Sequence, residues 1–146
     1  MSLRPSLFDS VFRWRRPAPP PGSPGRLVCL AATESQRGRL ARLAGLAGLA
    51  YVDAGSVAEA GALGATDGAI VALDRETAGE EWRGAVKLLA GMACVVLLAP
   101  QDGAQLWEEL ASLGGFEVLS DAVSDEEGIR LLKRARAWCR ARAVTR

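Results

Sequence analysis

An aspartate at the end of a short apolar run is the residue best suited to chemistry in this sequence. Residues 69–73 are apolar and lead directly to Asp74. A run of this kind indicates a buried parallel strand that delivers one carboxylate to the edge of a sheet. Glu34 and Asp121 follow two other apolar runs. Because hard cations take oxygen ligands, a metal site of these three acids is one interpretation; the other is that Asp74 caps the next helix.

Several other kinds of site are excluded by composition. The 146 residues contain no histidine, which removes histidine acid/base catalysis, a Ser-His-Asp triad and histidine metal ligands from this chain. The cysteines, Cys29, Cys94 and Cys139, are far apart and form no CxxC pair, so we interpret them as small apolar residues of a reducing cytoplasm. No glycine-rich phosphate loop follows the first apolar run. We therefore expect neither an enzyme nor a bound cofactor.

Five apolar runs alternate with amphipathic segments along the chain. The runs lie at residues 26–32, 50–54, 69–73, 94–99 and 116–119. Strands that are apolar on both faces need helices on both faces of a parallel sheet. With right-handed crossovers, the expected fold is a flavodoxin-like α/β sheet with strand order 2-1-3-4-5, whose ligands meet the carboxyl ends of the strands. Helices are expected between the strands, with Trp82 and Trp107 facing the sheet.

Charge and proline divide the chain into a tail and one domain. Residues 17–25 hold five of the seven prolines, so residues 1–25 are expected to be a flexible basic tail before a domain at 26–146. Residues 7–16 are aromatic and basic, which suits a partner groove, an anionic membrane or contact with the domain itself. Residues 128–146 carry seven basic residues and no acid, so the last helix is either a solvated face or a docking face.

Three segments, in their order and spacing, resemble a bacterial response-regulator receiver domain over about residues 26–142. They are residues 66–74, which begin a strand near Asp67 and end it on Asp74, residues 79–82 in the following loop, and residues 114–119 leading into the fifth strand. The resemblance implies that Asp74 occupies the phosphoacceptor position. It also implies a Mg²⁺ held by an acidic pair after the first strand, a hydroxyl after the fourth strand and a lysine after the fifth.

The sequence departs from that pattern at each supporting position. Ala31 and Ala32 replace the acidic pair, and Glu34 is the nearest acid. Ala99 stands at the hydroxyl position, and Asp121 stands where a lysine would pair with the phosphate. A carboxylate there repels a phosphoryl group, so the resemblance is to a degenerate receiver, or pseudo-receiver.

These observations predict a stand-alone, cytoplasmic receiver-like domain of two-component signalling that contacts a protein partner without being phosphorylated. The partner would be a histidine kinase or another signalling protein, with a homodimer through the last helix as a further expectation. Neither nucleic acid, a membrane span nor a cofactor is expected. Two alternatives stay open. One is an active receiver phosphorylated on Asp74 with Mg²⁺ and support from Glu34. The other is a flavodoxin-like ligand-binding module or small enzyme.

Overall fold

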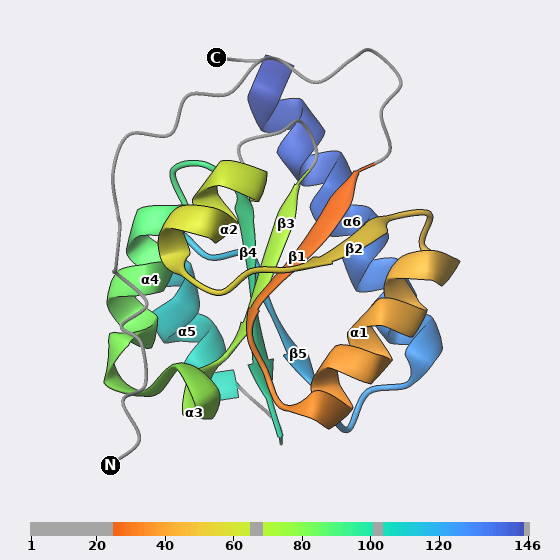
Figure 1. The fold of residues 1–146 in the computed structure, drawn as a ribbon, viewed down its shortest axis with the longest axis horizontal. Coiled ribbons are helices and arrows are strands. Elements are labelled where there is room, and N and C mark those ends of the chain that lie inside the picture. The colour runs from red at the N-terminus through yellow and green to blue at the C-terminus, as the bar shows by residue number, and fades with distance from the viewer. Residues whose placement is uncertain (1–24, 65–68, 101–103, 145–146) are drawn as a thin grey trace.

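A computed structural model describes residues 25–64, 69–100 and 104–144, and these residues form a five-stranded sheet (Figure 1). All strand pairs are parallel, and the order β2-β1-β3-β4-β5 confirms the flavodoxin-like prediction. The predicted tail lies almost wholly outside the described residues. The strands are β1 (Arg26–Ala31), β2 (Ala50–Asp53), β3 (Ile70–Asp74), β4 (Cys94–Ala99) and β5 (Glu117–Ser120).

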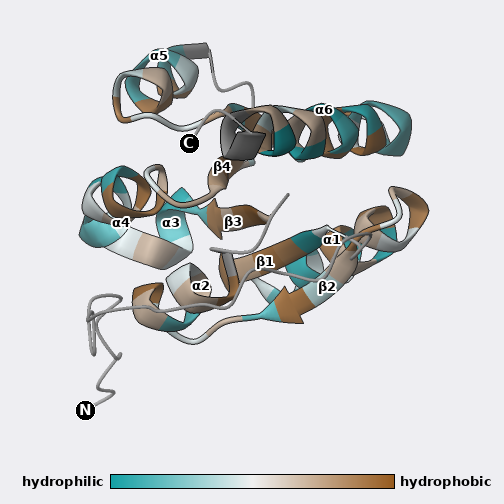
Figure 2. Cartoon of the chain, turned by 90° about the horizontal axis from the view of Figure 1, so that it is seen from above, coloured by the Kyte–Doolittle hydropathy of each residue, from teal (hydrophilic) through white to brown (hydrophobic). Residues whose placement is uncertain are grey.

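The inner strands are buried on both faces because helices cover both sides of the sheet. Every residue of β3 and β4 is buried, whereas the edge strand β2 is exposed at both ends. Figure 2 shows hydrophobic strands lying between helices that carry hydrophilic residues. This burial accounts for the continuous apolar runs in the sequence, since a strand covered on both faces has no polar side to alternate with.

The helices form two layers. Helices α1 (Glu34–Leu46) and α6 (Asp125–Val144) cover one face, and α2 (Val57–Gly64), α4 (Trp82–Leu89) and α5 (Ala104–Ser112) cover the other (Figure 1). Each layer closes its own apolar core against the sheet. Within the part of the chain that the structure describes, no helix combines the length and the hydropathy needed to cross a bilayer.

The segment between β3 and α4 differs from the expected plain loop. It contains the short helix α3 (Arg75–Ala78) and the 3₁₀ turn η1 (Gly79–Glu81). Gly79 ends α3 with a φ of 68°, a left-handed conformation that favours glycine. Gly79, which belongs to the segment that resembles the loop of a receiver domain, therefore serves here to end α3.

One tryptophan prediction is confirmed and the other is wrong. Trp82 is 3% exposed and lies in the core, whereas Trp107 is 46% exposed. On α5 the side of the helix toward the sheet is taken by Leu110, which is fully buried, and Leu106, which is partly buried. Trp107 follows Leu106 by one residue and so lies about 100° further round the helix, away from that side.

Candidate functional site: the carboxyl edge of the sheet

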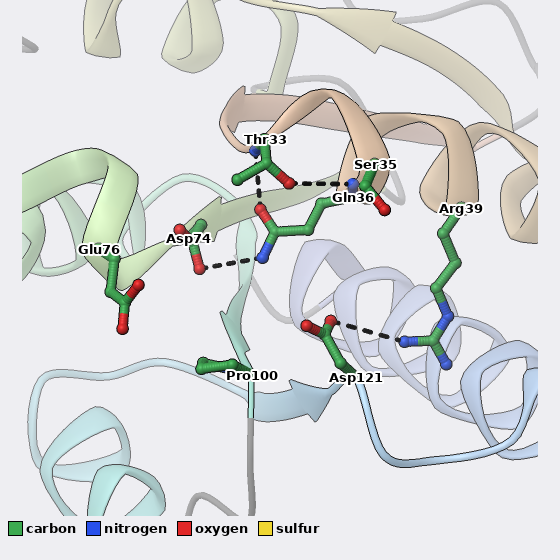
Figure 3. A pocket seen from close by; sticks show the side chains of 8 residues that line it. All are labelled: Thr33, Ser35, Gln36, Arg39, Asp74, Glu76, Pro100 and Asp121. Atoms are coloured by element: carbon green, nitrogen blue, oxygen red, sulfur yellow. Dashed lines mark hydrogen bonds and ion pairs between the residues drawn. The ribbon is translucent and has the colours of Figure 1, made fainter.

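Asp74 is buried, and both of its carboxylate oxygens accept hydrogen bonds. It is the last residue of β3 and is 3% exposed. Its Oδ2 accepts from the backbone amide of Thr77 at 3.0 Å and from the Thr77 hydroxyl at 2.7 Å, so Asp74 is the N-cap of α3. Its Oδ1 accepts from Nε2 of Gln36 at 3.0 Å (Figure 3). Neutral donors within the protein therefore satisfy this carboxylate at both oxygens.

The Gln36 side chain is held in one orientation by the start of α1. Thr33 is the N-cap of that helix: its hydroxyl accepts from the Gln36 amide at 3.2 Å, and its own amide donates to Gln36 Oε1 at 2.8 Å. This reciprocal arrangement is a capping box. Because Oε1 is engaged by Thr33, the amide nitrogen of the same side chain is the end that points at Asp74. A helix cap thus aims a donor at the buried carboxylate.

Arg39, one turn further along α1, reaches the segment after β5. Its guanidinium donates to the carbonyl oxygens of Ser120 at 3.1 Å and Val123 at 2.7 Å. It also forms ion pairs with Asp121 at 4.0 Å and Asp125 at 3.6 Å. The edge of the sheet therefore does carry a cation, although it comes from α1 and not from the end of β5.

These side chains line an open depression of about 420 Å³ at the carboxyl edge (Figure 3). Among the residues that the structure describes, its walls hold three carboxylates, of Asp74, Glu76 and Asp121, and one cation, that of Arg39. The remaining lining residues are Thr33, Ser35, Gln36 and Pro100. Such a surface is net acidic, so it is better suited to a cation or a neutral polar ligand than to an anion.

The three predicted site acids are not equivalent in the structure. Asp74 and Asp121 share the depression, and Asp121 is half exposed and paired with Arg39. Glu34 is the first residue of α1, is exposed, and is not among the residues that line the depression. Among the described residues, no three His, Cys, Asp or Glu side chains gather as a metal-binding group. In addition, the group that Gln36 directs at Asp74 is an N–H donor. A metal ion beside Asp74 would need an oxygen ligand at that place.

Alanines occupy the positions at this edge where a receiver domain would carry its acidic pair and its hydroxyl. Ala31 and Ala32 at the end of β1 are each 5% exposed, and Ala99 at the end of β4 is 1% exposed. Methyl groups there can neither ligate a metal ion nor donate a hydrogen bond to a phosphoryl oxygen. The ends of β1 and β4 thus supply neither a metal ligand nor a hydroxyl beside Asp74.

Two titratable groups near the end of β2 have altered pKa values. Burial, helped by a hydrogen bond from the Tyr51 hydroxyl to Asp53 Oδ1 at 2.8 Å, raises the pKa of Tyr51 well above its ordinary value. Burial likewise raises the pKa of the Cys29 thiol. Both groups are protonated at neutral pH, so Cys29 is not an activated nucleophile.

Comparison with known proteins gives matches in structure only. No family model and no curated protein matches the sequence. Among solved structures, a putative pilus assembly protein, CpaE, from Burkholderia thailandensis matches with a TM-score of 0.62 and 23% identity, over 79% of this chain and 99% of that one. Chemotaxis protein CheY4 of Vibrio cholerae matches with a TM-score of 0.62 and 16% identity, over 77% and 99% of the two chains.

A response regulator from Thermotoga maritima gives a TM-score of 0.63 at 13% identity, covering 77% of this chain and 98% of that one. The fold is that of a receiver domain. At these identities the likeness concerns the fold alone. What the side chains at the carboxyl edge of the sheet, here called the receiver-like edge, can do follows from their own contacts.

Three important residues of the receiver-like edge were missed from the sequence: Gln36, Thr77 and Arg39. Two of them had a readable signal. Thr33 and Gln36 have the spacing of a capping box, and Thr77 lies three residues after Asp74, as the partner of an N-cap does. Arg39 had none, because its partners lie more than 80 residues away along the chain.

Proposed function

We propose that this protein is a receiver-like domain of two-component signalling that acts by protein–protein contact and does not need phosphate on Asp74. The observation that carries the proposal is the environment of Asp74. This carboxylate is buried, caps α3 through Thr77 and accepts from Gln36. A carboxylate that already stabilises the fold through both oxygens has lost the freedom that nucleophilic attack on a phosphoryl group needs.

The surroundings of Asp74 support the same conclusion. In-line phosphoryl transfer to a carboxylate depends on positive charge that neutralises the transferred group. Here the nearest strand ends present Ala31, Ala32 and Ala99, and the depression contains two further carboxylates, Glu76 and Asp121. The cation of Arg39 is already engaged by carbonyl and carboxylate oxygens of residues 120–125.

The proposed contact surface consists of β5, which is the last strand in the sheet order, and of α5 and α6, which pack against β5 from opposite faces of the sheet. Trp107 on α5 supplies an exposed aromatic side chain, the kind of residue that anchors protein interfaces. Exposed Lys133, Arg134 and Arg140 supply positive charge on α6. We infer a protein partner with an acidic contact region, either a histidine kinase or another signalling protein. A second copy bound through α6 is the alternative, because the first turn of that helix is acidic and carries Asp125, Glu126 and Glu127.

The test is exposure of the protein to acetyl phosphate, and separately to beryllofluoride, each with Mg²⁺. We expect no covalent mass increase by mass spectrometry and no change in the tryptophan spectrum. A stoichiometric mass increase that disappears in Asp74→Asn would overturn the proposal and establish the active receiver, with Mg²⁺ as its cofactor. Glu34→Gln then tests whether Glu34 supports that reaction.

A ligand-binding module is the second candidate because the depression at the carboxyl edge is polar and open to solvent. Its net acidic lining predicts a cationic or neutral polar ligand. Equilibrium binding of such compounds that is lost in Asp121→Asn, together with no protein contact, would favour this candidate over the first.

A further inference from the structure

The segment that joins β5 to α6 wraps around a single guanidinium. Within residues 120–125, two carbonyl oxygens and two carboxylates contact Arg39. The two carbonyls, of Ser120 and Val123, flank the turn, and the two carboxylates, of Asp121 and Asp125, lie within and just after it. All four acceptors therefore converge on one side chain that is only 18% exposed.

The guanidinium is well matched to this position. Its planar fork presents several N–H donors in fixed directions and keeps its charge at all physiological pH values. Two directed bonds to carbonyl oxygens fix the backbone on both sides of the turn, and the shielding of the side chain from water strengthens them. An ammonium group offers no such fork, so a lysine at this position would not hold both carbonyls in the same way.

We propose that Arg39 is a positioning residue that holds the segment between β5 and α6, and with it the first turn of α6, in one fixed arrangement. The cation expected at the end of β5 is replaced there by Asp121, and α1 supplies Arg39 instead. This extends the proposed function, on which it rests for calling the α6 side of the domain a contact surface. On this proposal, the guanidinium of Arg39 fixes the position of that surface, and no phosphate on Asp74 is needed.

Arg42 offers a matched control on the same helix. It lies three residues further along α1 and forms an ion pair with the Asp125 carboxylate at 2.9 Å, but its side chain is 57% exposed. Both arginines thus contact Asp125, and Arg39 alone of the two reaches the backbone of the turn in the described residues. A difference between their variants isolates the backbone contacts.

The experiment is hydrogen exchange by mass spectrometry on the full chain, without any phosphodonor, for the unmodified protein, Arg39→Ala, Arg39→Lys and Arg42→Ala. In Arg39→Ala we expect amides of residues 121–128 to exchange about tenfold faster or more, while amides of β3 and β4 keep their protection. Arg39→Lys is expected to show most of that increase. Arg42→Ala is expected to stay within about twofold of the unmodified protein.

Two results would overturn this role for Arg39. One is exchange in residues 121–128 that is no faster in Arg39→Ala than in Arg42→Ala. The other is an increase in exchange of equal size in β3 and β4, which would mean general destabilisation. If Arg39→Ala does not fold, Arg39→Lys decides, by the same comparison of exchange in residues 121–128 with exchange in β3 and β4. Phosphorylation of Asp74 would refute the proposed function yet leave this exchange result unaffected, so the two failures can be told apart.

Discussion

The β3 end and the β5 end of the sheet are both tied to α1, but by opposite kinds of interaction. At the β3 end, an amide group of Gln36 meets the buried carboxylate of Asp74. At the β5 end, the charged Arg39 meets backbone carbonyls and half-exposed carboxylates. The two α1 residues are three positions apart and so lie on neighbouring parts of one helix face.

The difference teaches that one helix, α1, stabilises both ends of this edge, at β3 with the neutral amide of Gln36 and at β5 with the guanidinium of Arg39. The acidic strand end is satisfied by neutral donors, and the loop end is held by a cation supplied from another element. The first arrangement should be insensitive to salt because it is buried and involves one charged group, whereas the ion pairs of the second are partly exposed and open to screening.

The largest expected effect comes from removing the Asp74 carboxylate. Asp74→Ala removes the N-cap of α3 and leaves the Gln36 amide and the Thr77 hydroxyl without their acceptor, so we expect a loss of about 2–3 kcal/mol in the free energy of unfolding. Urea denaturation followed by circular dichroism measures it. Asp74→Asn should lose less, because asparagine also caps helices. A loss below about 0.5 kcal/mol for Asp74→Ala would contradict a structural role for this carboxylate.

The next effect concerns Gln36. Gln36→Ala removes one half of the capping box and one donor to Asp74, and should cost about 1 kcal/mol. Gln36→Glu can keep the contact to the Thr33 amide but places a second carboxylate against Asp74. Its loss at pH 7 should therefore be larger than that of Gln36→Ala and should decrease as the pH is lowered. Urea denaturation at pH 7 and in mild acid compares the two, and equal losses would argue against direct contact.

A smaller effect is expected from the carboxylates around Arg39. The double variant Asp121→Asn, Asp125→Asn leaves the carbonyl bonds of Arg39 intact and removes only partly exposed ion pairs, so it should cost about 0.5–1 kcal/mol. The cost should shrink between low salt and about 1 M salt, where charges are screened within roughly 3 Å. Thermal unfolding at the two salt concentrations tests this, with Asp74→Ala as the variant whose cost does not depend on salt.

The smallest effect at neutral pH is expected for Tyr51 at the end of β2. Its folded-state pKa is raised above the ordinary value of 10.0, so its contribution to stability is fully present below pH 10 and is lost as the pH rises further. Tyr51→Phe should be nearly neutral at pH 7 and should weaken the alkaline loss of stability. Unfolding curves from pH 7 to pH 11 measure the slope. An unchanged slope would show that another group titrates there.

Much of the fold could be predicted because burial on both faces of a sheet forces continuous apolar runs. The runs at residues 94–99 and 69–73 correspond closely to β4 and β3, and the strand order followed from their alternation with helices. The start of α6 also has a local signal in the sequence: Ser124 stands three residues before Glu127, and in the structure its hydroxyl accepts from the Glu127 amide at 3.2 Å. Trp107 shows the limit: its hydrophobicity indicated burial, yet its place round α5 left it half exposed.

The sequence by itself determined that a single carboxylate, Asp74, would end the central strand among alanines, because strand pattern and residue identity are local properties. Only the tertiary structure decided what that carboxylate does. The Gln36 amide and the Arg39 guanidinium reach their partners across 38 and 81 residues of chain, and packing of α1 against the strands brings them there. Contacts over such separations depend on the geometry of the whole sheet, which no local pattern specifies.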